Sequence, residues 1–251
     1  MNTQSVLQID ASHLQYRELN SRLREAVNER GVEHIEIHNV YGQRYVGTDL
    51  HRPVQIDIHG TPGNDLASFM DGPRIIVHGN AQDGCGNTMN SGEVVIHGSA
   101  GDVTGHSMRG GKIWVRDSVG YRVGIHMKEY LDTHPTIIIG GTAQHFLGEY
   151  MAGGILVVMG LNLQPGERHI ANFIGTGMHG GTMYVRGDLA DYQLGKGVGR
   201  LPLEDEDHAI LESLVAEYAT LFAVDLRAIF DRPFVKLRPL SRRPYGRIYA
   251  Y

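Results

Sequence analysis

Short apolar runs recur between Val54 and Val185, and within each run apolar residues alternate with other residues. Alternation with a period of two is typical of a β-strand that buries one face, so we predict a series of short strands. The inward residues stand four and two positions before the end of each run. They are Ile56 and Ile58, Ile75 and Val77, Val94 and Ile96, Ile113 and Val115, Ile137 and Ile139, Leu156 and Val158, and Met183 and Val185.

The residue that ends each run recurs at a regular interval of 19 residues. Later intervals of 24 and 27 residues contain extra residues near Lys128–His134 and Gln164–His169, where we expect loops. The register of the repeat therefore continues through both insertions. The run ends are Gly60, Gly79, Gly98, Asp117, Gly141, Gly160 and Gly187.

Two further positions repeat in register with the run ends. Most units have a methionine nine residues before the run end and a glycine twelve residues before it. Self-similarity with a period near 20 residues indicates a solenoid, and glycine fits its corners, where the chain needs positive φ or lies close to the next coil. The glycines of this second row are Gly86, Gly105, Gly148 and Gly175, with Gly124 once the first insertion is discounted.

A unit of 19 residues is too short to hold a crossover helix, so successive strands must pair directly, at about 4.8 Å. The sequence therefore predicts an all-β fold: a right-handed parallel β-helix of about seven turns with flanking helices. We expect an N-terminal strand and helix at residues 1–32, the β-helix at residues 33–202, and a C-terminal helical segment with a basic tail at residues 203–251.

The first part of the chain predicts a strand at Ser5–Ile9 and then a helix. Ser12 is the expected N-cap, and the helix should end before Gly31. Glu33–Val40 is the expected first strand of the coil.

The C-terminal part predicts an amphipathic helix after the acidic run Glu204–Asp207. Carboxylates there favour a helix N-terminus, and a metal site is the alternative interpretation. A second short helix is expected at Asp225–Phe230, where Pro233 prevents its continuation, followed by a strand at Phe234–Leu237.

The outward face of the predicted strands carries an apolar column. The residue three positions before each run end is Asp57 in one strand and apolar in the six that follow. A solvated face would be polar there, so this column needs a cover. The cover is either a terminal helix of the same chain or another subunit, which includes a second copy of this chain. The candidate interface residues are Ile76, Val95, Trp114, Ile138, Val157 and Tyr184.

The last twenty residues are basic and aromatic and contain no acidic residue. We expect either an arm that docks on an acidic partner or a strand folded back on the solenoid. Arg242, Arg243 and Tyr245 are the candidate docking residues.

Composition narrows the function. The net charge of −5 argues against a general nucleic-acid binder. The single cysteine, Cys85, excludes an internal disulfide and a four-cysteine iron–sulfur or zinc site. No signal-like start and no apolar run long enough for a membrane span are found, so we expect a cytoplasmic protein without membrane contact.

Several motifs have a structural explanation. His59, His78 and His97 should stack, but repetition alone aligns identical residues, so we predict no metal site. Gly175, Gly177 and Gly180 match a dinucleotide-binding motif but lead into a strand instead of a helix. Cys85 is better explained as a small corner residue than as a reactive thiol. No catalytic or cofactor-binding residue is predicted.

Two segments carry a family resemblance. GTAQHFLGEYMAGGILVVMG, ending at Gly160, and FIGTGMHGGTMYV, from Phe173 to Val185, resemble the GXGXG β-helix domain at the C-terminus of the glutamate synthase large subunit. IHNVYGQRYVGTDL near the start, and ILESLVAEY and FVKLRP near the end, are similar to the opening and closing segments of that domain. The resemblance covers roughly residues 33–239.

The resemblance implies a scaffold without its own chemistry. In that family the glutamine-hydrolysing nucleophile is an N-terminal cysteine, and the flavin and iron–sulfur cluster belong to a separate barrel domain. This chain begins with Met1 and Asn2, so no catalytic residue is carried over. The resemblance implies a non-catalytic structural subunit of a glutamate synthase-like oxidoreductase. Its partners would be a glutamine amidotransferase subunit and an FMN-dependent synthase subunit, with FMN and the iron–sulfur cluster on the partners.

Other functions stay open at this point. A similar repeat occurs in the C component of formylmethanofuran dehydrogenase and of the formyltransferase/hydrolase complex, although the C-terminal helices fit glutamate synthase better. An N-methylglutamate synthase type of complex is a related possibility. An independent enzyme or small-molecule binder would use a groove between the solenoid and the C-terminal helix, and a homo-oligomer would use the apolar column.

Overall fold

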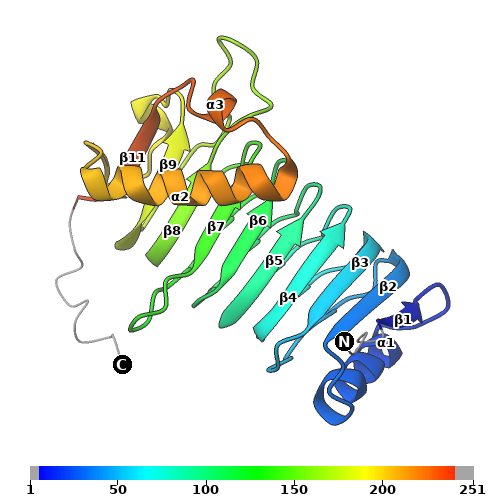
Figure 1. Cartoon of the computed structure of the whole chain (residues 1–251). Helices are drawn as coiled ribbons and strands as arrows, with labels where there is room; N and C mark the ends of the chain where they lie inside the picture. Colours follow the sequence, from blue (N-terminus) through cyan, green and yellow to red (C-terminus); the bar gives the residue numbers. More distant parts are fainter. Residues whose placement is uncertain (1–5, 241–251) are drawn as a thin grey trace.

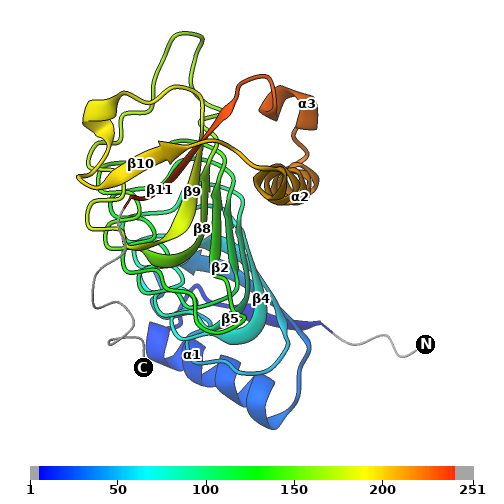
Figure 2. The ribbon, with the colours of Figure 1, turned by 90° about the vertical axis from the view of Figure 1, so that its left-hand side faces the viewer.

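The computed structural model describes residues 6–240 and shows a β-solenoid (Figure 1). Nine strands, β1 to β9, lie side by side in chain order, and each pairs in parallel with the next. Figure 2 shows their connections lying over one another on one side of the stack. The strands are β1 Leu7–Asp10, β2 His34–Tyr41, β3 Gln55–Thr61, β4 Asp71–His78, β5 Ser91–Ile96, β6 Lys112–Val115, β7 Thr136–Ile139, β8 Ala152–Val158 and β9 Gly180–Arg186.

The predicted fold class is confirmed, with a small correction to the number of turns. The solenoid has about six turns, whereas we expected about seven. The reason is that the seven run ends of the sequence belong to the seven strands β3 to β9, and seven strands bound six complete turns. Lys128–His134 and Gln164–His169 lie in loops, as expected.

The ladder register confirms the repeat. Ile56 pairs with Ile75, Ile75 with Val94, and Val94 with Ile113. All inward residues predicted from the alternation are buried at 1% exposure or less. Each such aliphatic side chain contributes about 1.5–3 kcal/mol relative to leaving it in water, so these stacked rows are the main source of stability.

Helices close the coil and cover one of its faces. They are α1 Tyr16–Arg24, the π-helical turn η1 Glu25–Glu29, the 3-10 turn η2 Asp191–Gln193, α2 Asp205–Phe222 and α3 Leu226–Ile229. Leu19 and Leu23 of α1 join the interior of the coil, so α1 caps its N-terminal end (Figure 1). The long helix α2 lies across the outward face of the sheet (Figure 2).

The N-cap of the first helix was predicted wrongly. Gln15, with an extended backbone, precedes α1, whereas Ser12 lies three residues earlier. The Ser12 N–H donates to Asp10 Oδ1 at 3.0 Å, so Ser12 forms a turn after β1. A serine two residues after an aspartate satisfies a turn as well as a cap, and the sequence does not separate the two.

The C-terminal elements follow the prediction. The acidic run forms the first turn of α2, where the Asp207 carboxylate accepts a 2.7 Å hydrogen bond from the Glu204 N–H. Strand β11, Phe234–Pro239, pairs antiparallel with β9, and β10, Val198–Leu201, pairs with β11. The first part of the basic tail is therefore a strand folded back on the solenoid.

The corners explain the repeated glycines. Each connection from β2 to β9 contains a set of three positive-φ residues, separated by one residue each, and the middle one points into the core. A Cβ on Gly105 would lie 2.2 Å from Ile137 Cδ1, and one on Gly86 would lie 2.4 Å from Ile113 Cδ1. The exception is Ala67, which takes the place of the middle glycine. The residue that corresponds there to Ile113 and Ile137 is Val94, which has no δ-methyl group to meet the alanine Cβ.

The run-end glycines serve a second close approach. A Cβ on Gly79 would lie 2.7 Å from the carbonyl oxygen of Gly60, and one on Gly98 would lie 2.7 Å from that of Gly79. Adjacent coils therefore touch through their backbones at this corner. A side chain there would separate the coils.

Candidate functional site

The apolar column is covered by α2 of the same chain. Its residues from β5 to β9 are each 1% exposed or less, and they pack in one cluster with Leu211, Leu214, Val215 and Tyr218 of α2. Ile76 on β4 is only partly buried at the edge of this cluster. Of the two covers that the sequence left open, the chain's own helix lies over the column. The buried residues are Val95, Trp114, Ile138, Val157 and Tyr184.

Polar contacts hold both ends of α2. At its N-terminus, Asp207 accepts hydrogen bonds from the Tyr184 hydroxyl and from Lys236 Nζ, each at 2.6 Å. Burial disfavours the Asp207 carboxylate, but these hydrogen bonds outweigh burial and hold the pKa of Asp207 below its ordinary value. Towards its C-terminus, the Tyr218 hydroxyl donates to the carbonyl oxygen of Arg116 at 2.8 Å. Because α2 is held at both ends, it covers the apolar column and leaves no room there for a partner subunit.

The other half of the outward face is polar and lies beyond α2. Four imidazole rings form a ladder that runs across the adjacent strands β2 to β5. They belong to His38 of β2, His59 of β3, His78 of β4 and His97, the first residue after β5. Their centroids are 4.6, 4.5 and 5.6 Å apart, and His97 lies against Phe222 at the end of α2. The predicted stack of three rings is thus present, with one ring more.

Sequence reasoning missed His38 because the spacing changes there. The His38 ring stacks on that of His59, which comes 21 residues later instead of 19, and the strand register shifts between Ile37 and Val40. Asn39, with φ of 58°, absorbs the extra residue. A count based on the 19-residue interval therefore passes over this strand, although its alternation H-I-E-I-H was a usable signal.

Carboxylates accompany the ladder. Asp57 accepts hydrogen bonds from His34, His78 and Gln55 at 2.8–3.0 Å. Burial raises its pKa, but these bonds outweigh burial and the net shift is downward. On the neighbouring strand, Glu36 accepts a 2.7 Å bond from the Gln8 amide, which lowers the pKa of Glu36.

One part of this face has the residue types of a metal site. Glu36, His38 and His59 each offer a ligand atom, and these atoms all lie within 4.8 Å of one another. Gln8 on β1 contacts two of the three, because its amide oxygen also lies 2.7 Å from His38 Nε2.

Four aromatic residues, of which Phe146 is partly buried and the others are exposed, gather on a different side of the coil. We call Tyr121, Phe146, Tyr150 and Phe173 the aromatic corner; they belong to the connections between β6 and β9, on the side away from α2 (Figure 2). Tyr121, Tyr150 and Phe173 are 45%, 39% and 51% exposed. Phe146 and Phe173 stack at 4.8 Å, and the Arg122 guanidinium lies 5.0 Å from the Phe146 ring.

The backbone at the aromatic corner is strained. Phe146, Tyr150 and Phe173 have φ of 63°, 53° and 60°, a region that costs a side-chain-bearing residue about 1–3 kcal/mol. They flank the middle glycine of each corner, and the equivalent residues Gly84 and Gly177 show that glycine fits there. Equivalent positions in other corners also carry side chains at positive φ, such as Val103 and Arg122, so this conformation belongs to the repeat.

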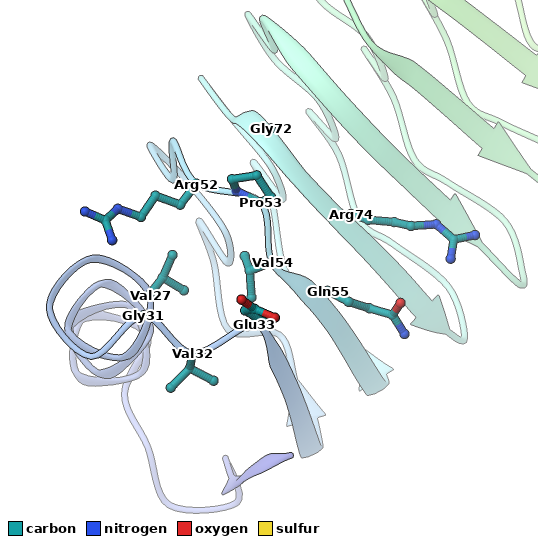
Figure 3. A pocket seen from close by; sticks show the side chains of 10 residues that line it. All are labelled: Val27, Gly31, Val32, Glu33, Arg52, Pro53, Val54, Gln55, Gly72 and Arg74. Atoms are coloured by element: carbon teal, nitrogen blue, oxygen red, sulfur yellow. The ribbon is translucent and has the colours of Figure 1, made fainter. Parts of the chain in front are cut away.

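A pocket lies between the end of η1 and the first residues of β3 and β4 (Figure 3). Its apolar lining comes from Val27, Val32 and Val54. The charged groups of Arg52 and Arg74 point to opposite sides of it in Figure 3, and Arg74 is paired with Glu93 at 2.5 Å. Polar groups do not converge here as they do in most ligand sites.

Among the described residues, the groove beside α2 also lacks a set of converging, unused polar groups. It is a shallow, mostly apolar opening between the helix and β5, lined by Glu93, Ser213, Ala216, Glu217, Thr220 and Leu221. Glu217 is engaged by Lys112 at 2.6 Å, and Glu93 accepts the indole N–H of Trp114 at 2.8 Å. Glu217 thus ties α2 to β6, whereas Glu93 joins residues of neighbouring strands.

The remaining candidates are structural or lie outside the described residues. Cys85 is fully buried at a corner, and burial raises the pKa of its thiol to about 12. Gly175 and Gly177 form a corner that leads into β9, as predicted. Arg242, Arg243 and Tyr245 lie outside residues 6–240.

A family model supplies the identification that no cluster of side chains gives. The model described as "GXGXG motif" matches residues 16–232, which include α1, all turns of the solenoid, α2 and α3. The chain belongs to the GXGXG family. This family is linked to the large subunit of glutamate synthase.

A relative of similar length extends the match. An uncharacterized protein of Methanocaldococcus jannaschii, MJ1350, is 44% identical over 249 residues, which cover 96% of this chain and 95% of that protein. The GXGXG domain therefore recurs in a chain of nearly the same extent. Among the described residues, no helix has both the length and the apolar character needed to cross a membrane.

Proposed function

We propose that this GXGXG protein is a non-catalytic structural subunit of a glutamate synthase-like oxidoreductase complex in the cytoplasm. It holds a glutamine amidotransferase subunit next to an FMN-dependent synthase subunit. FMN and the iron–sulfur cluster are carried by those partners, and the acceptor that is aminated is bound there. The family match over residues 16–232 is the observation that carries this proposal.

The chemistry of the chain supports a scaffold. Its interior consists of stacked aliphatic rows, and its one thiol is buried in a corner with a raised pKa. A four-thiolate cluster cannot be built from one cysteine. In the two openings beside α1 and α2, Arg74, Glu93 and Glu217 are used in ion pairs and hydrogen bonds within the chain.

The aromatic corner is the surface that we assign to the partner subunits. Because α2 occupies the apolar column, docking requires another exposed apolar surface, and aromatic residues are enriched at protein interfaces. Phe146 and Phe173 stack on each other at 4.8 Å, and Phe173 is 51% exposed. A partner that covers these rings would remove their exposed apolar area from water.

The test is copurification of the full chain with its physiological partners. The tagged protein, expressed in its native host, should retain a glutaminase and a flavoprotein in stoichiometric amounts, and glutamine-dependent glutamate formation should need all three. A lone chain with its own turnover would overturn the proposal. So would stable partners of a different chemistry, such as a formyltransferase, or a defined multimer of this chain alone.

A matched pair of variants addresses the surface. The double substitution Phe146→Ser and Phe173→Ser should reduce partner recovery strongly, whereas Tyr41→Ser, at a 92% exposed aromatic residue near the other end of the coil, should leave recovery unchanged. Equal recovery in both would show that the aromatic corner is not the docking surface, even if the complex itself forms.

A further inference from the structure

The histidine ladder contains a ligand set that the scaffold function does not use. Glu36 and His38 lie two residues apart on β2, so both point to the outward face, and the His59 ring on β3 stacks on the His38 ring with centroids 4.6 Å apart. The inward neighbours Ile35, Ile37, Ile56 and Ile58 are fully buried, which fixes the backbone beneath the three side chains.

We propose that Glu36, His38 and His59 form a binding site for a divalent first-row transition metal ion, with Zn²⁺ as the representative. Two imidazoles and one carboxylate are ligands typical of zinc, nickel, cobalt and copper sites, whereas calcium and magnesium prefer sites built from oxygen ligands. Three protein ligands leave coordination positions open to water on this uncovered face.

The required rearrangement is small. The three ligand atoms lie within 4.8 Å of one another, whereas atoms that share one ion at about 2.1 Å each cannot be more than about 4.2 Å apart. The rings of His38 and His59 are parallel, with an interplanar angle of 3°, so they must tilt towards a common point. Side-chain rotation supplies this movement, while the strand spacing stays the same.

The position within the ladder distinguishes this set from the other rings. His78 is held by Asp57 at 2.8 Å, and that carboxylate is shared with His34 and Gln55. Among the residues that the structure describes, the ring nitrogens of His59 have no hydrogen-bond partner, and Nε2 of its neighbour His38 lies 2.7 Å from Gln8 and 3.5 Å from Glu36. The metal would displace Gln8, whose amide bridges His38 and Glu36 without a metal.

The experiment is calorimetric titration of the chelator-treated full chain with Zn²⁺. We expect saturable binding of one ion per chain at micromolar concentrations, weakened about tenfold or more by each of His38→Ala, His59→Ala and Glu36→Ala. Co²⁺ used as a spectroscopic probe should give an absorption spectrum that His59→Ala abolishes. Thermal unfolding of each variant without metal confirms that the fold is intact.

His97→Ala and Gln8→Ala are the controls. His97 belongs to the same ladder but lies two strands away from His59, so its loss should leave the affinity within twofold. Loss of Gln8 removes a competing contact, so the affinity should be equal or higher. Absence of saturable binding, an equal loss in His97→Ala and His59→Ala, or a tenfold loss in Gln8→Ala would each overturn the assignment of these three ligands.

Discussion

The Tyr184 hydroxyl on β9 donates a 2.6 Å hydrogen bond to Asp207 in the first turn of α2. Lys236 of β11 donates to the same carboxylate, also at 2.6 Å. Tyr184, Asp207 and Lys236 are 1%, 5% and 5% exposed, so this contact joins the last strand, the covering helix and the returning tail in a place without water. The buried carboxylate decides how firmly α2 covers the column.

Acid should loosen this contact. Because the pKa of folded Asp207 is lowered, its contribution to stability is complete above the unfolded pKa of about 3.9 and is lost as the pH falls through the folded pKa. Asp207→Asn leaves the buried Lys236 with only the exposed Glu204 carboxylate, 3.7 Å away, and should lower the free energy of unfolding by about 3 kcal/mol at pH 7. Urea unfolding from pH 7 to pH 2 should show this difference shrinking below about pH 4. Parallel curves would contradict the role of Asp207.

Two isoleucines in one row test the cover of the column. Ile138 is fully buried beneath α2, whereas Ile76 is only partly buried at the edge of the same cluster. Ile138→Ala should lower the free energy of unfolding of the isolated chain by about 3 kcal/mol, and Ile76→Ala by less than half of that. Urea unfolding of the monomer measures both. Equal losses would mean that α2 does not cover the column in solution.

Two positions of the same corner, Gly105 and Val103, should differ strongly in their sensitivity to substitution. Gly105→Ala places a methyl group 2.2 Å from Ile137 Cδ1 at φ of 71°, and strain and crowding together should cost about 2–4 kcal/mol. Val103 has φ of 51° and is only partly buried, so Val103→Gly releases strain and should change stability by less than about 1 kcal/mol. Thermal unfolding of both variants is the measurement. A tolerated Gly105→Ala would contradict the packing argument.

Cys85 should be inert in the folded protein. Its side chain is fully buried, and burial raises the pKa of its thiol to about 12, so hardly any thiolate exists at pH 8. A disulfide reagent should leave the native chain unlabelled at pH 8 and modify one thiol per chain in urea. Rapid labelling of the native chain would show that this corner opens.

The sequence predicted the coil well because the same short pattern of residues recurs in every turn. The units share the same alternation and, except for the one with Ala67, the same corner glycine, so one unit predicts the pairing of all. The cross-strand pairs of Ile75 with Val94 and of Val94 with Ile113 follow from the 19-residue interval alone. The prediction lost accuracy where the interval changes, and His38 was missed for that reason.

The aromatic corner and the Glu36 cluster needed coordinates for a related reason. Whether Phe146 and Phe173 point outward depends on positive φ values, which are unusual for bulky residues and cannot be expected from their type. Glu36 and His38 become neighbours of His59 only through a strand pairing that departs from the repeat.

The sequence by itself determined the solenoid, its filled interior and the existence of an apolar column that needs a cover. Only the tertiary structure decided that α2 is that cover. An apolar stripe and an apolar column each show that a partner is required, but neither specifies which one. That choice depends on contacts between distant residues, such as Tyr218 with Arg116 and Lys112 with Glu217, about a hundred residues apart in the chain.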